Sequence, residues 1–144
     1  MKLAEWDTTF GNDLAFITSR LSALKTSEVV SLSGKDDQAR ERALMVTDVG
    51  LLDCHEAWPG SNDTEPDLAG WRGHFEVRLI PWTDVPIPWI VFVGFVNSSG
   101  NLEPGREAAR VTMELDPRFT HSYDDAKQVK AATVFFNAVV ERRR

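Results

Sequence analysis

The most constraining feature of this sequence is an unbroken apolar run, WIVFVGFV, at residues 89–96. A strand with one wet face alternates apolar and polar residues, whereas this run is apolar on both faces of the strand it would form. We therefore expect the central strand of a sheet, covered on both sides. In a chain of 144 residues that cover comes either from helices on both faces or from a second subunit, so a homodimer is one expectation.

Two segments with strand periodicity lie on either side of this run. HFEVRLI, residues 74–80, alternates apolar and polar side chains, and so does REAARVTMEL, residues 106–115. Short connections favour pairing between strands that follow one another along the chain. The sequence thus predicts a three-stranded antiparallel β-meander with residues 89–96 in the middle.

Three other segments have helical periodicity. Apolar residues recur at three- and four-residue steps between residues 10 and 24, and a similar pattern begins after Gly34, where two aspartates suit a helix N-terminus. A third helix, capped by Thr120 or Ser122, ends the chain. Its second half, ATVFFNAVV, is apolar nearly all round and offers a surface for a homodimer. Residues 28–32 fit a helix or a strand.

The predicted fold is therefore α+β, with a three-stranded antiparallel β-meander packed with two N-terminal helices and one C-terminal helix. Its composition, 42% hydrophobic and 26% charged, is typical of a globular domain. No repeat or linker divides the chain, so we expect one domain spanning residues 1–144.

The charge of the chain favours some partners over others. With 22 acidic and 16 basic side chains the formal charge is −6, which repels nucleic acid and attracts a basic protein partner. Solubility alone also explains such a charge. A single cysteine cannot form an internal disulfide, no segment fits a signal peptide, and no apolar run is long enough for a membrane. We therefore expect a cytoplasmic protein.

Catalytic and metal-binding signatures are weak. Cys54, His55 and Glu56 are adjacent, but neighbours on a helix point about 100° apart and cannot act together. The paired spacings of metal ligands are missing, so we expect no metal and no cofactor. His74 and Arg78 flank Glu76 on one strand face, where they could line a polar pocket as base and anion holder. A solvated face with a Glu–Arg pair is the simpler explanation.

Tryptophan is the more distinctive signal. Four of the five tryptophans lie beside proline or glycine, where they either close the core or form a recognition surface. The connection PWTDVPIPW, residues 81–89, combines two of them with apolar residues in a segment expected to be wet. We assign Trp89 to the core of the chain itself. The predicted partner surface comprises Trp82, Asp84, Val85 and Ile87, together with Trp58 and Trp71.

Two functions follow from these features. The first is a small acidic, non-enzymatic module that binds a protein partner through aromatic-rich loops, like an immunity protein, an adaptor or a chaperone. The alternative is a small-molecule-binding protein or compact enzyme whose pocket between sheet and helices uses His74, Glu76 and Arg78.

Overall fold

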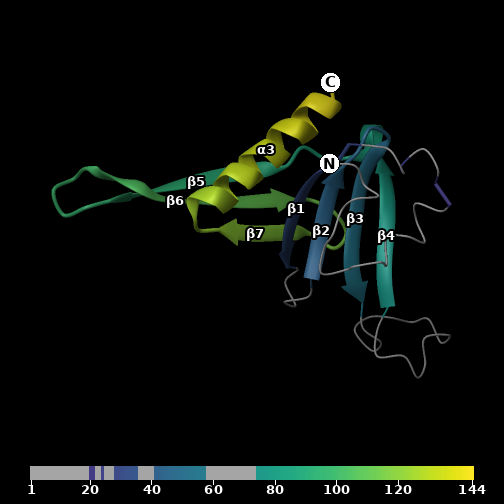
Figure 1. Ribbon diagram of the computed structural model, residues 1–144, viewed down its shortest axis with the longest axis horizontal. Coiled ribbons are helices and arrows are strands. Elements are labelled where there is room, and N and C mark those ends of the chain that lie inside the picture. The colour runs from purple at the N-terminus through teal and green to yellow at the C-terminus, as the bar shows by residue number, and fades with distance from the viewer. Residues whose placement is uncertain (1–19, 22–23, 25–27, 36–40, 58–73) are drawn as a thin grey trace.

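The computed structural model describes residues 20–21, 24, 28–35, 41–57 and 74–144. They form two antiparallel sheets and one C-terminal helix (Figure 1). The α+β class is confirmed. The helix predicted between residues 10 and 24 lies almost entirely outside the described residues.

The first sheet, sheet I, has four strands in sequential order. They are β1 (Val30–Lys35), β2 (Glu41–Val46), β3 (Gly50–Ala57) and β4 (His74–Pro81). Each pairs antiparallel with the next, so sheet I is a meander built by local pairing. Of residues 28–32, which fitted either structure, residues 30–32 belong to strand β1.

The predicted second helix is wrong, because residues 41–57 form β2, a turn and β3. Their apolar residues are so dense that they fit a helical period and a buried strand alike, and short apolar runs do not separate the two. The turn between the strands decides the outcome. The Thr47 hydroxyl donates to the Gly50 carbonyl at 2.7 Å and accepts from the amides of Val49 and Gly50, which favours a tight hairpin over a continuing helix.

The second sheet, sheet II, has three strands in the order β5-β6-β7. They are β5 (Trp89–Val96), β6 (Leu102–Met113) and β7 (Phe119–Tyr123). The predicted meander is therefore wrong in its first member, because β4 pairs with β3 in sheet I and not with β5. A short 3-10 helix, η4 (Trp82–Asp84), and an extended segment at 85–88 lead from one sheet to the other.

The C-terminal helix α3 (Ala126–Arg142) is confirmed, with a later start than the predicted caps. Thr120 and Ser122 belong to β7, and the Asp125 carboxylate caps the helix by accepting from the Gln128 amide at 2.9 Å. Helix α3 packs against β1, β2, β6 and β7. Its buried residues lie three or four positions apart, which places them on one stripe; they are Val129, Ala132, Phe135 and Val139.

Two hydrophobic clusters lie on the two faces of sheet I. The larger fills the space between sheet I, sheet II and α3, and includes Leu32, Leu44, Val46, Leu51, Val111, Met113, Phe119 and Phe135. The smaller, on the opposite face, comprises Leu24, Val29, Ala43, Met45, Leu52 and Cys54. Sheet I is thus the strand layer that is buried on both faces.

The two sheets meet closely at β1 and β7. A Cβ atom at Gly34 would lie 3.0 Å from the His121 ring and 3.1 Å from the Phe119 ring. The Tyr123 hydroxyl donates to the Ser33 carbonyl at 3.2 Å across the same contact. Glycine at position 34 is therefore what lets the second sheet approach the first.

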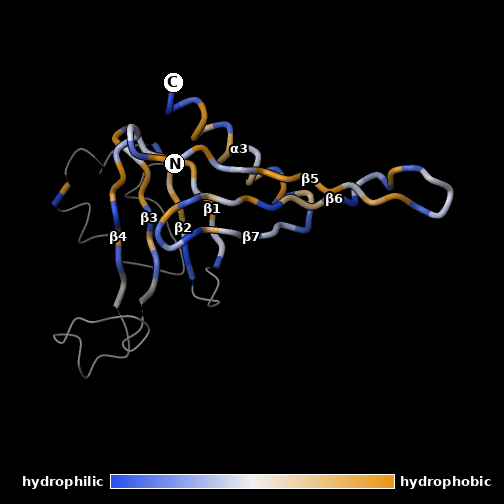
Figure 2. Tube along the Cα trace, turned by 180° about the vertical axis from the view of Figure 1, so that it is seen from behind, coloured by the Kyte–Doolittle hydropathy of each residue, from blue (hydrophilic) through white to orange (hydrophobic). Residues whose placement is uncertain are grey.

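Strand β5 departs most from expectation. Predicted to be central and dry, it is an edge strand of sheet II, and Trp89 is 71% exposed. The β5–β6 hairpin extends well beyond the rest of the described chain (Figure 1), and hydrophobic residues follow it outward (Figure 2). An apolar run on both strand faces therefore has no cover from the described residues.

The contact at Gly34 generates a first prediction. Gly34→Val inserts a branched side chain against two packed rings, and overpacking of this kind costs about 1–3 kcal/mol. Urea unfolding should show that loss in the free energy of unfolding. Ser33→Val, at an exposed neighbouring position, should change it little, and equal losses in both variants would contradict the proposed contact.

Candidate interaction surface

The projecting part of the β5–β6 hairpin, residues 91–107, is called the arm below. Every residue of β5 from Val91 to Val96 is exposed, as is the whole turn that follows it. A hairpin standing alone gains little from burial, so the arm depends on its own turn and ladder for its shape.

The tip of the arm is closed by a well-bonded turn. The Asn97 side-chain oxygen accepts from the amides of Ser99 and Asn101 at 3.0 and 3.1 Å, and the Asn97 amide donates to the Asn101 carbonyl at 2.8 Å. Gly100 has φ of +83°, in the left-handed region that favours glycine. The tip is therefore pre-organised by local hydrogen bonds.

An irregularity in the ladder lies behind the tip. Gly94 pairs with Glu107, whereas Val96 pairs with Leu102, so residues 103–106 of β6 lie opposite Phe95 alone. Bulges of this kind bend a strand pair and raise its twist. The bulge also carries the ion pair between Arg106 and Glu103 at 3.0 Å, and the Arg106 guanidinium lies 4.9 Å from the centre of the Phe95 ring.

Large apolar side chains dominate the surface of the arm and its base. These eight residues, called the arm surface, are 38–71% exposed: Ile87, Trp89, Val91, Phe92, Val93, Phe95, Val96 and Leu102. At about 150–250 Å² for a large side chain, their exposed parts total on the order of 800 Å². The largest apolar patch of a typical monomer is about 300–600 Å². The arm surface therefore has the extent of a binding surface.

The arm surface covers both faces of β5. Trp89 and Val91 pair with Thr112 and Arg110 of β6, and these residues line a shallow hollow of about 300 Å³ on the outer face of sheet II together with Glu114. Phe92 lies on the other face, that of the buried Ala109 with which it pairs, since opposed residues share a face. A ligand that covered only one face of β5 would leave the apolar side chains of the other face exposed to solvent.

The outer edge of β5 is also open. Sheet II ends at β5, and no described strand pairs with that edge. Alternate N–H and C=O groups of an edge strand point away from the sheet and are free to pair with another chain. Proteins commonly protect such edges with a charge or a proline, and β5 contains neither.

The structure divides the predicted surface around PWTDVPIPW. Asp84 is exposed and Ile87 is 57% exposed, whereas Val85 is 1% exposed in the larger core cluster. Trp82 is half-buried, and its indole N–H donates to the Thr47 carbonyl at 3.1 Å.

The two remaining predicted partner residues, Trp58 and Trp71, lie outside the described residues. Trp89, assigned by sequence to the core, is exposed instead. The partner surface therefore stays a prediction, and of its residues Ile87 belongs to the arm surface.

A buried polar cluster lies on the inner face of sheet I, beside the larger core. The Arg42 guanidinium donates to both Asp53 carboxylate oxygens at 3.0 and 2.9 Å, and Arg78 donates to Asp53 as well. The side chains of Arg42 and Asp53 have no solvent exposure. Arg42 also donates to the Arg118 carbonyl at 3.1 Å, which joins sheet I to the loop that precedes β7.

Two of the three predicted pocket residues, Glu76 and Arg78, belong to this cluster. Glu76 and Arg78 lie on one face of β4, as expected, and the His55 Nε2 atom lies 3.0 Å from the Glu76 carboxylate. The backbone of His74 pairs with Ala57 at the end of β4, while its side chain is outside the described parts of the chain. The cluster adds three residues absent from the predicted site, namely Arg42, Asp53 and His55.

Two nitrogens of the cluster lack a hydrogen-bond partner, the Nδ1 atom of His55 and the Nε atom of Arg78. The His55 Nδ1 atom lies 3.9 Å from Asp53, beyond hydrogen-bond distance. The opposed charges otherwise satisfy one another within the chain, which is the arrangement of a structural ion-pair network. Neither the hollow on sheet II nor the cavity described next is lined by this cluster.

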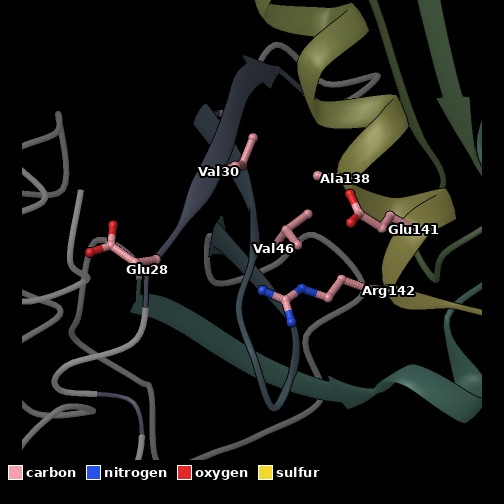
Figure 3. A pocket seen from close by; sticks show the side chains of 6 residues that line it. All are labelled: Glu28, Val30, Val46, Ala138, Glu141 and Arg142. Carbon is pink, nitrogen blue, oxygen red and sulfur yellow. The ribbon is translucent and has the colours of Figure 1, made fainter.

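A separate cavity of about 470 Å³ lies between β1, β2 and the end of α3 (Figure 3). Its lining mixes the apolar Val30, Val46 and Ala138 with Glu141 and Arg142. Arg142 pairs with Asp48 at 2.6 Å, in the turn between β2 and β3. This ion pair holds the last turn of α3 to sheet I.

Other classes of site find little support. Across the described ranges, no group of three or more His, Cys, Asp and Glu side chains is placed to hold a metal ion. Within the same ranges, no helix has the length and apolar character needed to cross a membrane.

No protein-family model, curated protein or solved structure matches this chain.

The polar cluster predicts how stability depends on pH. Burial alone would raise the pKa of Asp53, but His55, Arg42 and Arg78 outweigh it and hold that pKa well below its usual range. In the unfolded chain the Asp53 carboxyl has a pKa of about 4. The stabilisation from Asp53 is therefore complete above that pH and is lost as the pH falls toward the lower folded-state pKa.

Asp53→Asn tests this expectation. It leaves Arg42 and Arg78 without a counter-charge, which should cost about 3–5 kcal/mol at neutral pH. Denaturant unfolding over a pH series should show the gap between wild type and variant narrowing below about pH 4. Asp84→Asn, at an exposed site, should show neither effect, and a gap independent of pH would contradict the role of Asp53.

The buried thiol yields another prediction. Burial, with a further contribution from the negative charge of Asp53, raises the pKa of Cys54 to about 12. A neutral, buried thiol is a poor nucleophile, so a thiol-specific reagent should label native Cys54 only at the rate of unfolding. Ser99→Cys, at the exposed arm tip, should react at once. Rapid native labelling of Cys54 would refute this assignment.

Proposed function

We propose that this protein is a non-enzymatic protein-interaction module that binds a polypeptide partner through the arm. The single observation that carries the proposal is the arm surface, eight large apolar residues exposed on a projecting hairpin and at its base. Such a surface is costly in water, and binding a partner recovers the free energy of burying it.

The chemistry of the arm favours a polypeptide over a small molecule. An open strand edge offers main-chain N–H and C=O groups in the spacing that another extended chain can match. The apolar side chains stand on both faces of that edge, so a partner strand with its own side chains on both faces complements them. A small ligand is usually held in a concave site, whereas the arm projects from the body (Figure 1).

The polar cluster gives the alternative function less support. Glu76 and Arg78, which were expected to line a pocket, contact His55 and Asp53 of their own chain. Their side chains are 47% and 38% exposed, but neither residue lines the hollow on sheet II or the cavity beside α3. The arrangement of these residues as mutual partners is explained by stability alone.

Replacing Phe92 with a photo-crosslinking amino acid tests the proposal. Phe92 is 58% exposed on the arm, and Val134, 47% exposed on α3, is a matched control position. Irradiation in the native host should give a polypeptide adduct at Phe92 and none at Val134. Mass spectrometry then identifies the adduct as a second copy or as a different protein, and either result supports the proposal.

A variant of the arm completes this experiment. Phe92→Lys places a charge among the apolar residues and should remove polypeptide adducts formed through a crosslinker at the neighbouring position Val91. Its melting temperature should stay close to that of wild type, because Phe92 lies outside the core cluster. No polypeptide adduct at either arm position, in a protein that folds normally, would refute the proposal.

A further inference from the structure

We infer that the polypeptide bound by the arm is a second copy of this chain, paired edge to edge through β5. This inference rests on the proposed function and names its partner. The two β5 strands run antiparallel about a two-fold axis and join two copies of sheet II into one continuous sheet. The interface is isologous, so the same residues serve on both sides.

The sequence of β5 is apolar throughout, so an antiparallel second copy meets it with apolar residues, and one register also sets a large side chain against a glycine. With the axis at Val93, Phe92 lies opposite Gly94 of the other copy, and Val91 lies opposite Phe95. Ile90 then lies opposite Val96. Opposed residues share a face of an antiparallel pair, so each contact is apolar against apolar, and the large Phe92 ring meets the residue with no side chain.

The geometry leaves room for this pairing. Helix α3 packs against β6 and β7 and against sheet I, while the arm extends past the helix into solvent (Figure 1). A second arm can therefore lie beside the open edge of the first along residues 91–96, all of which are exposed. The antiparallel direction brings the tip of each arm beside the base of the other, near Trp89.

The area of the arm surface matches the requirement of a stable dimer. Its exposed apolar parts total on the order of 800 Å² per copy, which is about what one partner of a standard protein interface buries. In this register the residues from Ile90 to Val96 of the two copies lie beside one another across the axis, whereas Ile87 and Leu102 of the arm surface lie outside the paired segment.

Charge supports a second copy over a basic partner. The region from Val85 to Met113 contains two acidic residues, Glu103 and Glu107, and two basic residues, Arg106 and Arg110. Its formal charge is thus zero, whereas the whole chain carries −6. A binding element without net charge is compatible with its own copy and gives no attraction for a basic protein.

Two matched variants test the inference. Val93 is 42% exposed on the proposed axis, and Val134 is 47% exposed on α3, the helix that sequence analysis favoured for a homodimer. Sedimentation velocity should show a dimer for wild type and for Val134→Lys. Val93→Lys places two ammonium groups together on the axis and should weaken the dimer by about 100-fold or more.

A charge swap tests the position of the axis. Val93→Glu should be monomeric by the same repulsion, and mixing it with Val93→Lys should restore a dimer that contains one of each chain. Wild-type dimers should hold or tighten when salt is raised, because screening weakens the repulsion between acidic bodies. Melting temperatures near that of wild type would show that the variants are folded; these are Val93→Lys, Val93→Glu and Val134→Lys.

The results separate this inference from the proposed function. Wild type that remains monomeric up to about 100 µM, a dimer that survives Val93→Lys, or a dimer that Val134→Lys disrupts would each overturn the inference. If wild type is monomeric and the crosslinker at Phe92 captures a different protein, the proposed function stands and the second copy is wrong. If neither experiment yields a polypeptide partner, both fail.

Discussion

A buried guanidinium is the point on which the arrangement of the two sheets depends. Arg42 is fixed to Asp53 by two hydrogen bonds within sheet I and donates a third to the Arg118 carbonyl, just before β7. It also lies 5.7 Å from the centre of the Phe119 ring in sheet II. Breaking a buried pair of this kind leaves an uncompensated charge and costs several kcal/mol. The orientation of β7 against sheet I is therefore strongly specified.

The exposure of the arm follows from that arrangement. With β7 held at Gly34 and Arg42, and α3 filling the space between the sheets, β6 is the last strand of sheet II that reaches the core. Val111 and Met113 of β6 are fully buried, whereas β5 contributes only the partly buried Ile90 to that core. The strand with the most apolar sequence is thus the one that the fold places farthest out.

Sequence periodicity predicted the local structure better than the pairing. The last helix and the strand character of β4, β5 and β6 were predictable, because their patterns match one period clearly. The segment at 41–57 was not, since Leu44, Val46 and Leu51 suit a buried strand and a helix face alike. The assignment of β4 to a different sheet from β5 depends on the contact at Gly34 and on Arg42, and long-range packing of this kind leaves no periodic signal.

The apolar character of β5 on both faces was predictable from the sequence, whereas its position at the exposed edge of sheet II was not. Unbroken apolar character at 89–96 led to the expectation that both faces of the strand are covered, by helices or by a second subunit, and cover from a second subunit stays a prediction. The error was to assume that a dry sequence means a central strand. Asn97, Gly100 and Gly105 were the available signals of an isolated hairpin, because turn residues at a tip and in a bulge shape a ladder without help from a core.

Charge and exposed apolar surface lie on different parts of this chain, and they have different effects on association. An acidic body keeps copies apart at long range and opposes indiscriminate association, whereas the region from Val85 to Met113, which has no formal net charge, acts only at contact. An unprotected edge strand is ordinarily a risk of open-ended aggregation. Two-fold pairing of β5 removes that risk, because it consumes both open edges at once and leaves β7, which is packed against β1, at the ends of the joined sheet. Because β5 contains no charge and no proline, it is prone to aggregation when its edge is open. The same absence suits it to two-fold pairing, in which both edges are used.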